Sequence, residues 1–384
     1  MFKRPGWRKL GVLLPNSGQT ARLPAGKFPK SVSLLAWGYN EEDLVEGFLA
    51  RAHARMEATV EDFEIVFVDD GSTDRTPELA DAFAASHPRV RVVHHPCNLN
   101  VGRATRTAVA AARKEFLFWQ TVDWSYDLGN LRTYLELLNH FDVVQGIRPT
   151  PVRPLTHIPV IRSFYRVKSR SDTLWKAVVS LGNYYMLRIF YGAPFHDLQN
   201  VTFYPTKLVQ DLELVGDSAF VNPELLLKTH AKGVRFIEVP IPFIPRTVGE
   251  AKGTRLPAVL RALRDVTLHW FLWGRRRMIS NWRTGKHQVF RTSEPYYLSL
   301  EVIRIVAPLF PIFASSDDPR FGAVAEDLKQ AFEATRRRPP APRQIPEASA
   351  VTEEGDVEPG DPDKDRPAVP DPFVEHQVAA GPAR

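Results

Sequence analysis

Two adjacent carboxylates end an apolar run early in the chain. The run Ile65–Val68 is followed at once by the tetrapeptide Asp69–Ser72, and a helical pattern begins near Pro77. This order predicts a buried strand, a tight turn and a helix start. Ligands of open α/β sheets bind at the carboxyl ends of the strands, which is where these acids fall. The sequence Asp-Gly-Ser is also common in turns without any function, so the stretch alone leaves a structural and a functional role open.

Polar residues also follow two other strands that the sequence predicts. Ser31–Trp37 is apolar and breaks at Gly38–Glu42, and Phe116–Val122 ends at Asp123. Asn40 in the first break fits the N-cap of the helical pattern that follows it.

Strand-like and helical patterns alternate along the first 150 residues. Further strands are predicted at Val90–Val93 and Asp142–Gly146, and helices at Leu79–Ala85, Gly102–Arg113 and Leu131–Leu138. Alternation at this spacing predicts an α/β fold with a doubly wound, mostly parallel sheet.

The composition predicts a sizeable core and a basic folded part. The chain has 384 residues, 44% of them apolar, and a formal net charge of +6. Residues 333–384 carry 7 Lys and Arg against 11 Asp and Glu, which leaves 43 basic and 33 acidic residues for the rest. This excess favours anionic partners: nucleotide phosphates, lipid phosphates or an anionic membrane surface. The single cysteine, Cys97, excludes an intrachain disulfide and fits a reducing cytoplasm.

Several segments are suited to lie on a membrane, and none is suited to cross one. No stretch reaches the roughly 18 uninterrupted apolar residues of a span. Residues 162–191 interleave cations with aromatic residues, Leu256–Leu272 is amphipathic, and Val302–Phe313 is apolar but broken by prolines. Such segments suit a lipid surface. A core helix with a solvated basic face would explain 162–191 equally well, and no nucleic-acid motif accompanies these cations.

Taken in order, these motifs resemble the family 2 glycosyltransferases with a GT-A fold, and among them the dolichyl- and polyprenyl-phosphate sugar transferases. The resemblance covers roughly residues 31–253, and it is specific as a set although each motif alone is weak. The matching positions are Tyr39-Asn40-Glu41, Val68-Asp69-Asp70-Gly71-Ser72 with Asp74 and Thr76, Asn100 and Gly102, Asp123, Gly146 and Arg148, Asp197, Glu224, Glu238-Val239-Pro240-Ile241, and Arg246 with Gly249, Glu250 and Lys252.

The resemblance implies that the first two motifs hold the nucleoside of a UDP- or GDP-linked sugar. Tyr39, Glu41 and Asp70 would contact the nucleoside, and Val68 would lie beside the base. Of the two adjacent acids, Asp70 is expected to face the donor and Asp69 to be structural.

The later motifs would hold the diphosphate. Val122 and Asp123 would both contact the nucleotide sugar, and Asp123 would reach the Mg2+ or Mn2+ that bridges the diphosphate. Arg148, Arg246 and Lys252 would neutralise phosphate groups of donor and acceptor. A diphosphate leaving group needs a divalent metal held by carboxylates, cations, or both, because negative charge grows on it during transfer.

The metal motif departs from the family pattern. The usual Asp-x-Asp reads Thr121-Val122-Asp123 in this chain. The loss of one carboxylate predicts weaker metal binding or a less essential metal. Ser125 is a possible but poor further ligand. Asp127 either compensates or caps the next helix.

Three functions remain open, with catalysis assigned to Asp123, Asp197 and Arg246. In the first, the sugar moves to a polyprenyl phosphate by one inverting in-line displacement, and the anionic acceptor needs no strong base. In the second, the acceptor is a hydroxyl of a saccharide or lipid, which needs a base, and Asp197 is the candidate. In the third, which Thr121 favours, the chain binds nucleotide sugars without catalysis.

The expected organisation has four parts: a basic arm at 1–29, the GT-A domain at 30–255, an amphipathic membrane-associating extension at 256–332 and a disordered tail at 333–384. The GT-A domain is divided into a nucleotide-sugar half, 30–150, and an acceptor half with helical additions, 151–255. We expect the protein to lie at the periphery of the membrane, on its cytoplasmic face, and to have no nucleic-acid partner.

Overall fold

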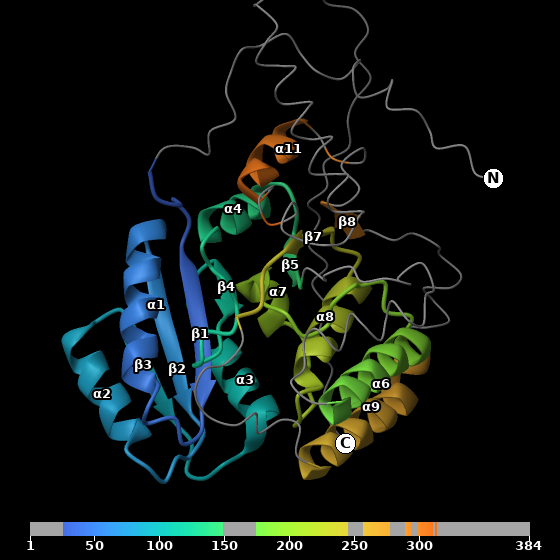
Figure 1. The fold of residues 1–384 in the computed structure, drawn as a ribbon, viewed down its shortest axis with the longest axis horizontal. Helices are drawn as coiled ribbons and strands as arrows, with labels where there is room; N and C mark the ends of the chain where they lie inside the picture. Colours follow the sequence, from blue (N-terminus) through green and yellow to red (C-terminus); the bar gives the residue numbers. More distant parts are fainter. Residues whose placement is uncertain are drawn as a thin grey trace, which may run out of the picture. The chain divides into compact units, whose positions relative to one another are not determined.

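The computed structural model of the chain contains one sheet with helices on both of its faces (Figure 1). The residues that it describes are 26–148, 174–244, 256–276, 289–292, 298, 300–309 and 312. Most of the predicted basic arm and all of the predicted tail at 333–384 lie outside these residues.

Eight strands form the sheet within the described residues, in the order β3-β2-β1-β4-β6-β5-β7-β8. They are β1 (Val32–Gly38), β2 (Phe63–Asp69), β3 (Val90–His94), β4 (Phe116–Trp119), β5 (Val143–Ile147), β6 (Thr202–Pro205), β7 (Phe236–Pro240) and β8 (Val289–Arg291). Of these strands, β6 runs antiparallel to β4 and β5, and the other pairings are parallel. The predicted doubly wound, mostly parallel sheet is therefore confirmed.

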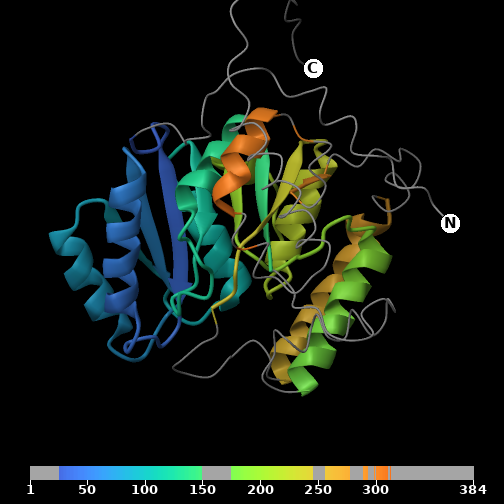
Figure 2. The same ribbon diagram turned by 45° about the horizontal axis from the view of Figure 1, so that its top comes forward.

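Helices cover both faces of this sheet, as Figure 2 shows. One face packs against α1 (Val45–Thr59), α2 (Thr76–Ser86), α4 (Leu131–Glu136) and α11 (Leu300–Val306). The other packs against α3 (Asn100–Ala111), α6 (Leu174–Tyr191), α7 (Thr206–Gln210), α8 (Val221–Ala231) and α9 (Leu256–His269), which a π-helical turn continues to Gly274. Because β2 is covered on both sides, all seven of its residues are buried, and its central residues Ile65–Val68 form a continuous apolar run.

The boundaries of two predicted elements are wrong. The strand predicted to reach Val122 ends at Trp119, because Gln120 turns its side chain to the carbonyl of Tyr126, at 2.7 Å. Asn40 does not cap the first helix, which begins at Val45 with Leu44 at the N-cap. Asn40 instead adopts a left-handed backbone, with φ of 53°.

The apolar segment that contains α11 belongs to the core. Val302, Ile305, Val306 and Leu309 are at most 9% exposed, belong to the core cluster on the α1 face of the sheet, and α11 lies against α4. This segment therefore does not offer those side chains to a membrane, contrary to the expectation for Val302–Phe313.

The helices α6 and α9 lie side by side (Figure 1), and they contain the described parts of the predicted segments 162–191 and Leu256–Leu272. The indole N–H of Trp270 donates to the Phe190 carbonyl at 2.8 Å, and the Tyr191 hydroxyl donates to the Val266 carbonyl at 2.6 Å. None of the helices in the described part of the chain combines the length and the apolarity needed to cross a bilayer.

Candidate active site

The direction of the strands brings the predicted site residues to one edge of the sheet. Tyr39, Asp70, Asp123 and Arg148 follow the parallel strands β1, β2, β4 and β5. The segment Asp197–Asn200 precedes β6 and reaches the same edge, because β6 runs the opposite way. Chain segments that are far apart in the sequence thus meet at the carboxyl ends of the strands.

Hydrogen bonds join the loops after β1 and β2. The Asn40 N–H donates to the Ser72 hydroxyl at 2.9 Å, and the Thr73 N–H donates to the Asn40 side-chain oxygen at 2.9 Å. The Glu41 N–H donates to the Thr76 hydroxyl at 2.8 Å. These bonds fix the backbone that carries Tyr39 and Glu41, whose contact with a nucleoside stays a prediction.

Asp69 uses both of its carboxylate oxygens within the protein. Oδ1 accepts the Ser72 N–H at 3.0 Å, and Oδ2 lies 3.1 Å from Nδ1 of His94. Gly71 has a φ of 69°, and a Cβ there would lie 2.2 Å from the carbonyl carbon of Cys97, so only glycine fits this turn. Asp69 therefore holds the turn together, as a structural acid would.

Asp70 is bonded differently. Its Oδ1 accepts the Leu99 N–H at 2.9 Å and lies 2.7 Å from Nδ1 of His95. Both bonds go to Oδ1. The sequence interpretation missed His94 and His95, although one signal was available. His94 ends β3 and His95 follows it, directly beside Asp69, which ends β2, and Asp70, which follows it.

The two valines assigned to the donor site are buried. Val68 is 0% exposed and packs in the core between the sheet and α3, so it has no accessible side-chain atom to place beside a base. Val122 is 8% exposed and packs in the core on the other face.

Asp123 and Ser125, the two residues expected near a metal, lie together in a tight turn. The Ser125 hydroxyl donates to Oδ1 of Asp123 at 2.7 Å. Trp124 has a φ of 56°, and its N–H donates to the Thr121 carbonyl at 2.8 Å. The Thr121 hydroxyl, at the position where the family has an acid, accepts the Ser125 N–H at 2.9 Å. Threonine thus helps to close this turn.

The neighbouring acid Asp127 also closes a turn, because its Oδ1 accepts the Gly129 N–H at 2.8 Å. The cap position of α4 itself is Asn130. Within the described residues, no cluster of three His, Cys, Asp or Glu side chains could hold a metal ion. Asp123 is consequently the acid at this turn that remains as a candidate metal ligand, with Ser125 beside it.

Arg148 and Asp197 form a buried ion pair. The guanidinium donates to Oδ2 from Nε and to Oδ1 from Nη2, each at 2.8 Å. The backbone N–H of Arg148 also donates to Oδ2, and the backbone N–H of Gln199 donates to Oδ1, each at 3.2 Å. Burial lowers the pKa of Arg148, but the charge and hydrogen bonds of Asp197 together with Tyr126 outweigh it, so this pKa lies above its ordinary value. Asp197 therefore accepts four N–H groups.

The segment after β7 connects the Asp123 turn to this ion pair. The Ile244 N–H donates to the Ser125 carbonyl at 2.8 Å, and the Tyr126 hydroxyl donates to the Gln199 carbonyl at 2.6 Å. The Arg148 guanidinium lies 5.9 Å from the centre of the Phe243 ring. Arg246 and Lys252 lie outside the described residues.

Two fully buried glutamates of the matching motifs have structural partners. Glu224 accepts the N–H groups of Val215 and Gly216 and pairs with Lys228 at 2.7 Å. Glu238 lies 2.6 Å from Nδ1 of His196 and 3.1 Å from Nε of Arg291. Burial raises the pKa of Glu238, but His196 and Arg291 outweigh it and hold the pKa below its ordinary value.

Comparisons with known proteins agree on one family. The model of glycosyl transferase family 2 matches residues 38–191. A dolichyl-phosphate hexose transferase of Haloferax volcanii is 30% identical over 216 residues, 56% of this chain and 82% of that protein. An undecaprenyl-phosphate mannosyltransferase of Micrococcus luteus is 26% identical over 52% of this chain and 79% of that protein. The match to glycosyltransferase AglD of Haloferax volcanii, 31% identical, spans 22% of that protein's length.

Solved structures with nucleotide ligands are more distant. A glucosyl-3-phosphoglycerate synthase of Mycobacterium tuberculosis, in complex with Mn2+, UDP and glucosyl-3-phosphoglycerate, is 18% identical with a TM-score of 0.43, over 70% of this chain and 86% of that one. A mannosyltransferase of Pyrobaculum calidifontis, in complex with GDP-Man and Mn2+, is 16% identical with a TM-score of 0.41, over 86% of this chain and 92% of that one. The sequence relatives decide the assignment: the chain belongs to glycosyl transferase family 2.

Proposed function

We propose that the chain transfers a hexosyl group from a nucleotide sugar to a polyprenyl phosphate, with inversion of the anomeric centre. The relatives that share most of their length with it are named for transfer to dolichyl phosphate and to undecaprenyl phosphate. The choice of a phosphate acceptor rests on one observation: the carboxylate of Asp197 accepts hydrogen bonds from four N–H groups.

A hydroxyl acceptor needs a base with a lone pair for its proton. A carboxylate offers about four lone-pair sites, and those of Asp197 are taken by Arg148 and Gln199. A phosphate monoester is already anionic near pH 7 and attacks without a base. The geometry at Asp197 thus favours the phosphate acceptor over the hydroxyl acceptor.

The donor would be a UDP- or GDP-linked sugar, with its nucleoside at Tyr39, Glu41 and Asp70. Asp123 and Ser125 offer the hard oxygen atoms that Mg2+ or Mn2+ prefers, and their hydroxyl–carboxylate contact of 2.7 Å keeps both on one side of the turn. A divalent metal held there supplies positive charge to the leaving diphosphate.

Cations of the chain would neutralise the remaining phosphate charge. Arg148 stands at the carboxyl end of β5 with its guanidinium fixed by Asp197, and Arg246 and Lys252 would contribute from the segment after β7. Arginine can bind a phosphate at two points, whereas lysine acts as a point charge.

The acceptor lipid would be reached from the membrane surface through α6 and α9. Large apolar residues are exposed on these helices and on the turn that follows α9: Tyr185, Ile189, Phe190, Leu260, Leu263, Leu268, Phe271 and Leu272. Five arginines are exposed among them: Arg188, Arg261, Arg264, Arg275 and Arg276. Asp265 is the one acid among the described side chains of these helices. Such a surface suits the anionic cytoplasmic face of a membrane.

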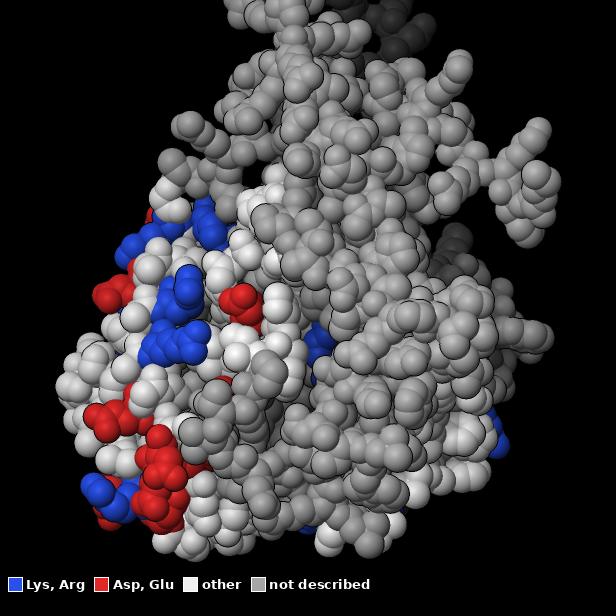
Figure 3. All heavy atoms as spheres, viewed as in Figure 1, with Lys and Arg blue, Asp and Glu red and all other residues white. Residues whose placement is uncertain are grey.

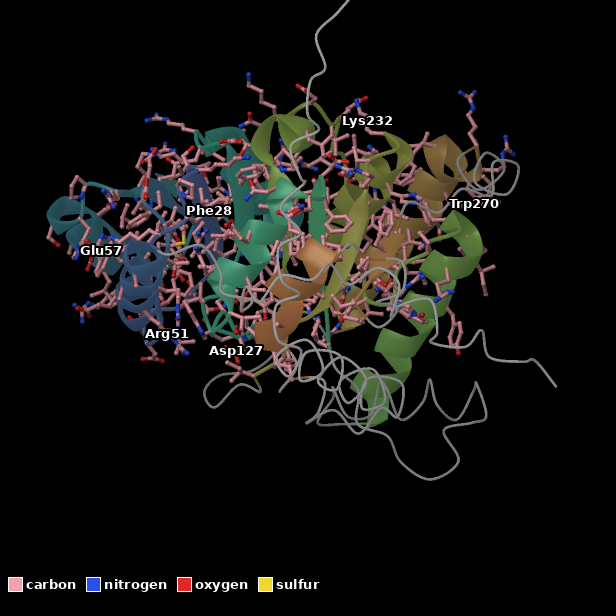
Figure 4. All side chains as sticks on the ribbon, turned by 90° about the horizontal axis from the view of Figure 1, so that it is seen from above. Phe28, Arg51, Glu57, Asp127, Lys232 and Trp270 are labelled. Atoms are coloured by element: carbon pink, nitrogen blue, oxygen red, sulfur yellow. The ribbon has the colours of Figure 1, made fainter. Side chains whose placement is uncertain are left out.

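The surface over α1 and α2 is different. Over α1 and α2, acidic and basic side chains lie beside one another (Figure 3). Trp270, next to α9, lies on the opposite side of the sheet from Arg51 and Glu57 of α1 (Figure 4). The proposed lipid-facing surface is thus separate from the α1–α2 side.

The proposal is tested by incubating the full-length chain with radiolabelled UDP- and GDP-sugars, Mn2+ and either a polyprenyl phosphate or a mixture of hydroxyl acceptors. We expect label in the lipid fraction, and none when Asp123 is replaced by alanine. Label that enters hydroxyl acceptors alone would refute the phosphate acceptor. Metal-dependent nucleotide-sugar binding without any transfer would show a non-catalytic binder.

A further inference from the structure

A histidine outside every motif discussed above holds Asp70 in place. Nδ1 of His95 lies 2.7 Å from Oδ1 of Asp70, and the two side chains are 7% and 6% exposed. Oδ1 also accepts the Leu99 N–H at 2.9 Å. Two donors therefore occupy one oxygen of this buried carboxylate, and they come from the segment between β3 and α3.

The other nitrogen of the ring is also bonded. Nε2 of His95 lies 2.9 Å from the hydroxyl of Thr107 on α3. When that hydroxyl donates to Nε2, the neutral ring carries its proton on Nδ1 and donates it to Asp70. Thr107 thus holds the ring in the orientation that Asp70 needs, as an outer partner does for a ligating histidine.

The neighbouring pair shows what is particular about Asp70. Asp69 is bonded through Oδ1 to Ser72 and through Oδ2 to His94, so both of its oxygens serve the fold. Both bonds of Asp70 go to Oδ1, so its other oxygen is the one that a ligand can use. A carboxylate oxygen at this edge is suited to accept an N–H of a nucleobase.

We propose that His95 is a positioning residue for nucleotide recognition. It holds Oδ1 of Asp70 so that Oδ2 is presented to the donor nucleoside. This inference rests on the proposed function in one respect, namely that Asp70 contacts the nucleoside. It adds His95 and Thr107 to the residues that determine donor affinity.

Substitutions of His95 can separate the two bonds of the ring. The amide nitrogen of asparagine takes approximately the place of Nδ1, so His95→Asn keeps a donor for Asp70. Glutamine reaches the place of Nε2, so His95→Gln keeps a group near Thr107 and removes the donor from Asp70. The matched control is His94→Ala, which removes the pair with Asp69 one residue earlier.

The measurement is calorimetric titration of the full-length chain with UDP and with GDP in the presence of Mn2+, together with donor KM and kcat. We expect His95→Ala and His95→Gln to weaken nucleotide binding about 10-fold, since each removes a bond to a charged group. The donor KM should rise in parallel, with kcat little changed. His95→Asn and His94→Ala should stay within about 3-fold of the wild type.

Thermal unfolding of each variant separates positioning from folding. Equal melting temperatures for His95→Asn and His95→Gln, with different nucleotide affinities, would support the proposal even if His95→Ala does not fold. Equal affinities of these two variants would overturn it. If the wild type binds neither UDP nor GDP, the proposed donor class fails and the inference fails with it, whereas binding by the wild type and all His95 variants alike refutes the inference alone.

Discussion

The side chains of Arg148 and Asp197 meet at two points, Nε to Oδ2 and Nη2 to Oδ1, each at 2.8 Å. Asp197 is 2% exposed. The pair joins the end of β5 to the segment that leads into β6. The two hydrogen bonds fix the orientation of the guanidinium. They also occupy both carboxylate oxygens, so Asp197 is unsuited to remove a proton from a substrate.

Asp197→Asn should leave a buried arginine without its counter-charge. We expect the free energy of unfolding to fall by about 3 kcal/mol, as for other broken buried pairs. The double change Arg148→Met with Asp197→Leu should recover most of that stability while activity stays low. Denaturant titration measures the first effect. An Asp197→Asn variant with unchanged stability that loses transfer to hydroxyl acceptors alone would reveal a catalytic base.

Asp70→Asn should weaken nucleotide binding more than Asp69→Asn. The amide presents a donor where the nucleoside needs an acceptor, and we expect a loss of about 10-fold for Asp70→Asn. Asp69→Asn should lower the melting temperature instead, since Asp69 holds Ser72 and His94. Calorimetry with UDP and GDP, combined with thermal unfolding, distinguishes the two changes. The reverse order of affinities would mean that Asp69 faces the donor.

Asp123→Ala should abolish the part of nucleotide binding that depends on Mn2+, because Asp123 is the acid that remains in the metal motif. Ser125→Ala should weaken it only a few-fold, since a neutral hydroxyl is a weaker ligand than a carboxylate. Thr121→Asp restores the second acid of the family pattern and should tighten Mn2+ binding. Titrations with and without Mn2+ measure all three. Metal-independent binding in the wild type would contradict the assignment.

The stability of the protein should depend on Glu238 in a defined pH range. Its pKa in the folded state lies below the ordinary value of 4.5. The ionised group therefore contributes stability that is present above about pH 4.5 and is lost as the pH falls through the folded pKa. The stability difference between wild type and Glu238→Gln should be largest near neutral pH and shrink in acid. Glu78, whose side chain is 77% exposed, is substituted in the same way as a surface control.

Substitutions on the α6–α9 surface should separate membrane binding from folding. Phe271 and Leu272 are 61% and 62% exposed, so replacing both by glutamate should leave the melting temperature unchanged. Binding to vesicles that contain phosphatidylglycerol should fall about 10-fold, and binding of the wild type should weaken with salt. Val215→Glu, at an apolar residue that is 39% exposed on a loop, is the matched control. Equal sedimentation of all variants with vesicles would exclude this surface.

Local patterns in the sequence predict several strands and the polar residues that follow each of them. A run such as Ile65–Val68 identifies a strand that is covered on both faces, and the residues after each run identify the edge where ligands bind. The ordered motifs also indicated the family, which the relatives confirm. The sequence alone therefore determined the strands of the first half of the chain, the mostly parallel direction of the sheet and the family of enzymes to which the chain belongs.

Only the tertiary structure decided which side chains pair. Arg148 and Asp197 are 49 residues apart, and His95 and Asp70 are 25 apart, so no local pattern shows that each acid is already bonded. The burial of Val68 and of the α11 residues likewise depends on which elements cover them. Periodicity determines which residues share a face of a strand or helix, whereas long-range packing decides what that face contacts and which lone pairs remain for a substrate.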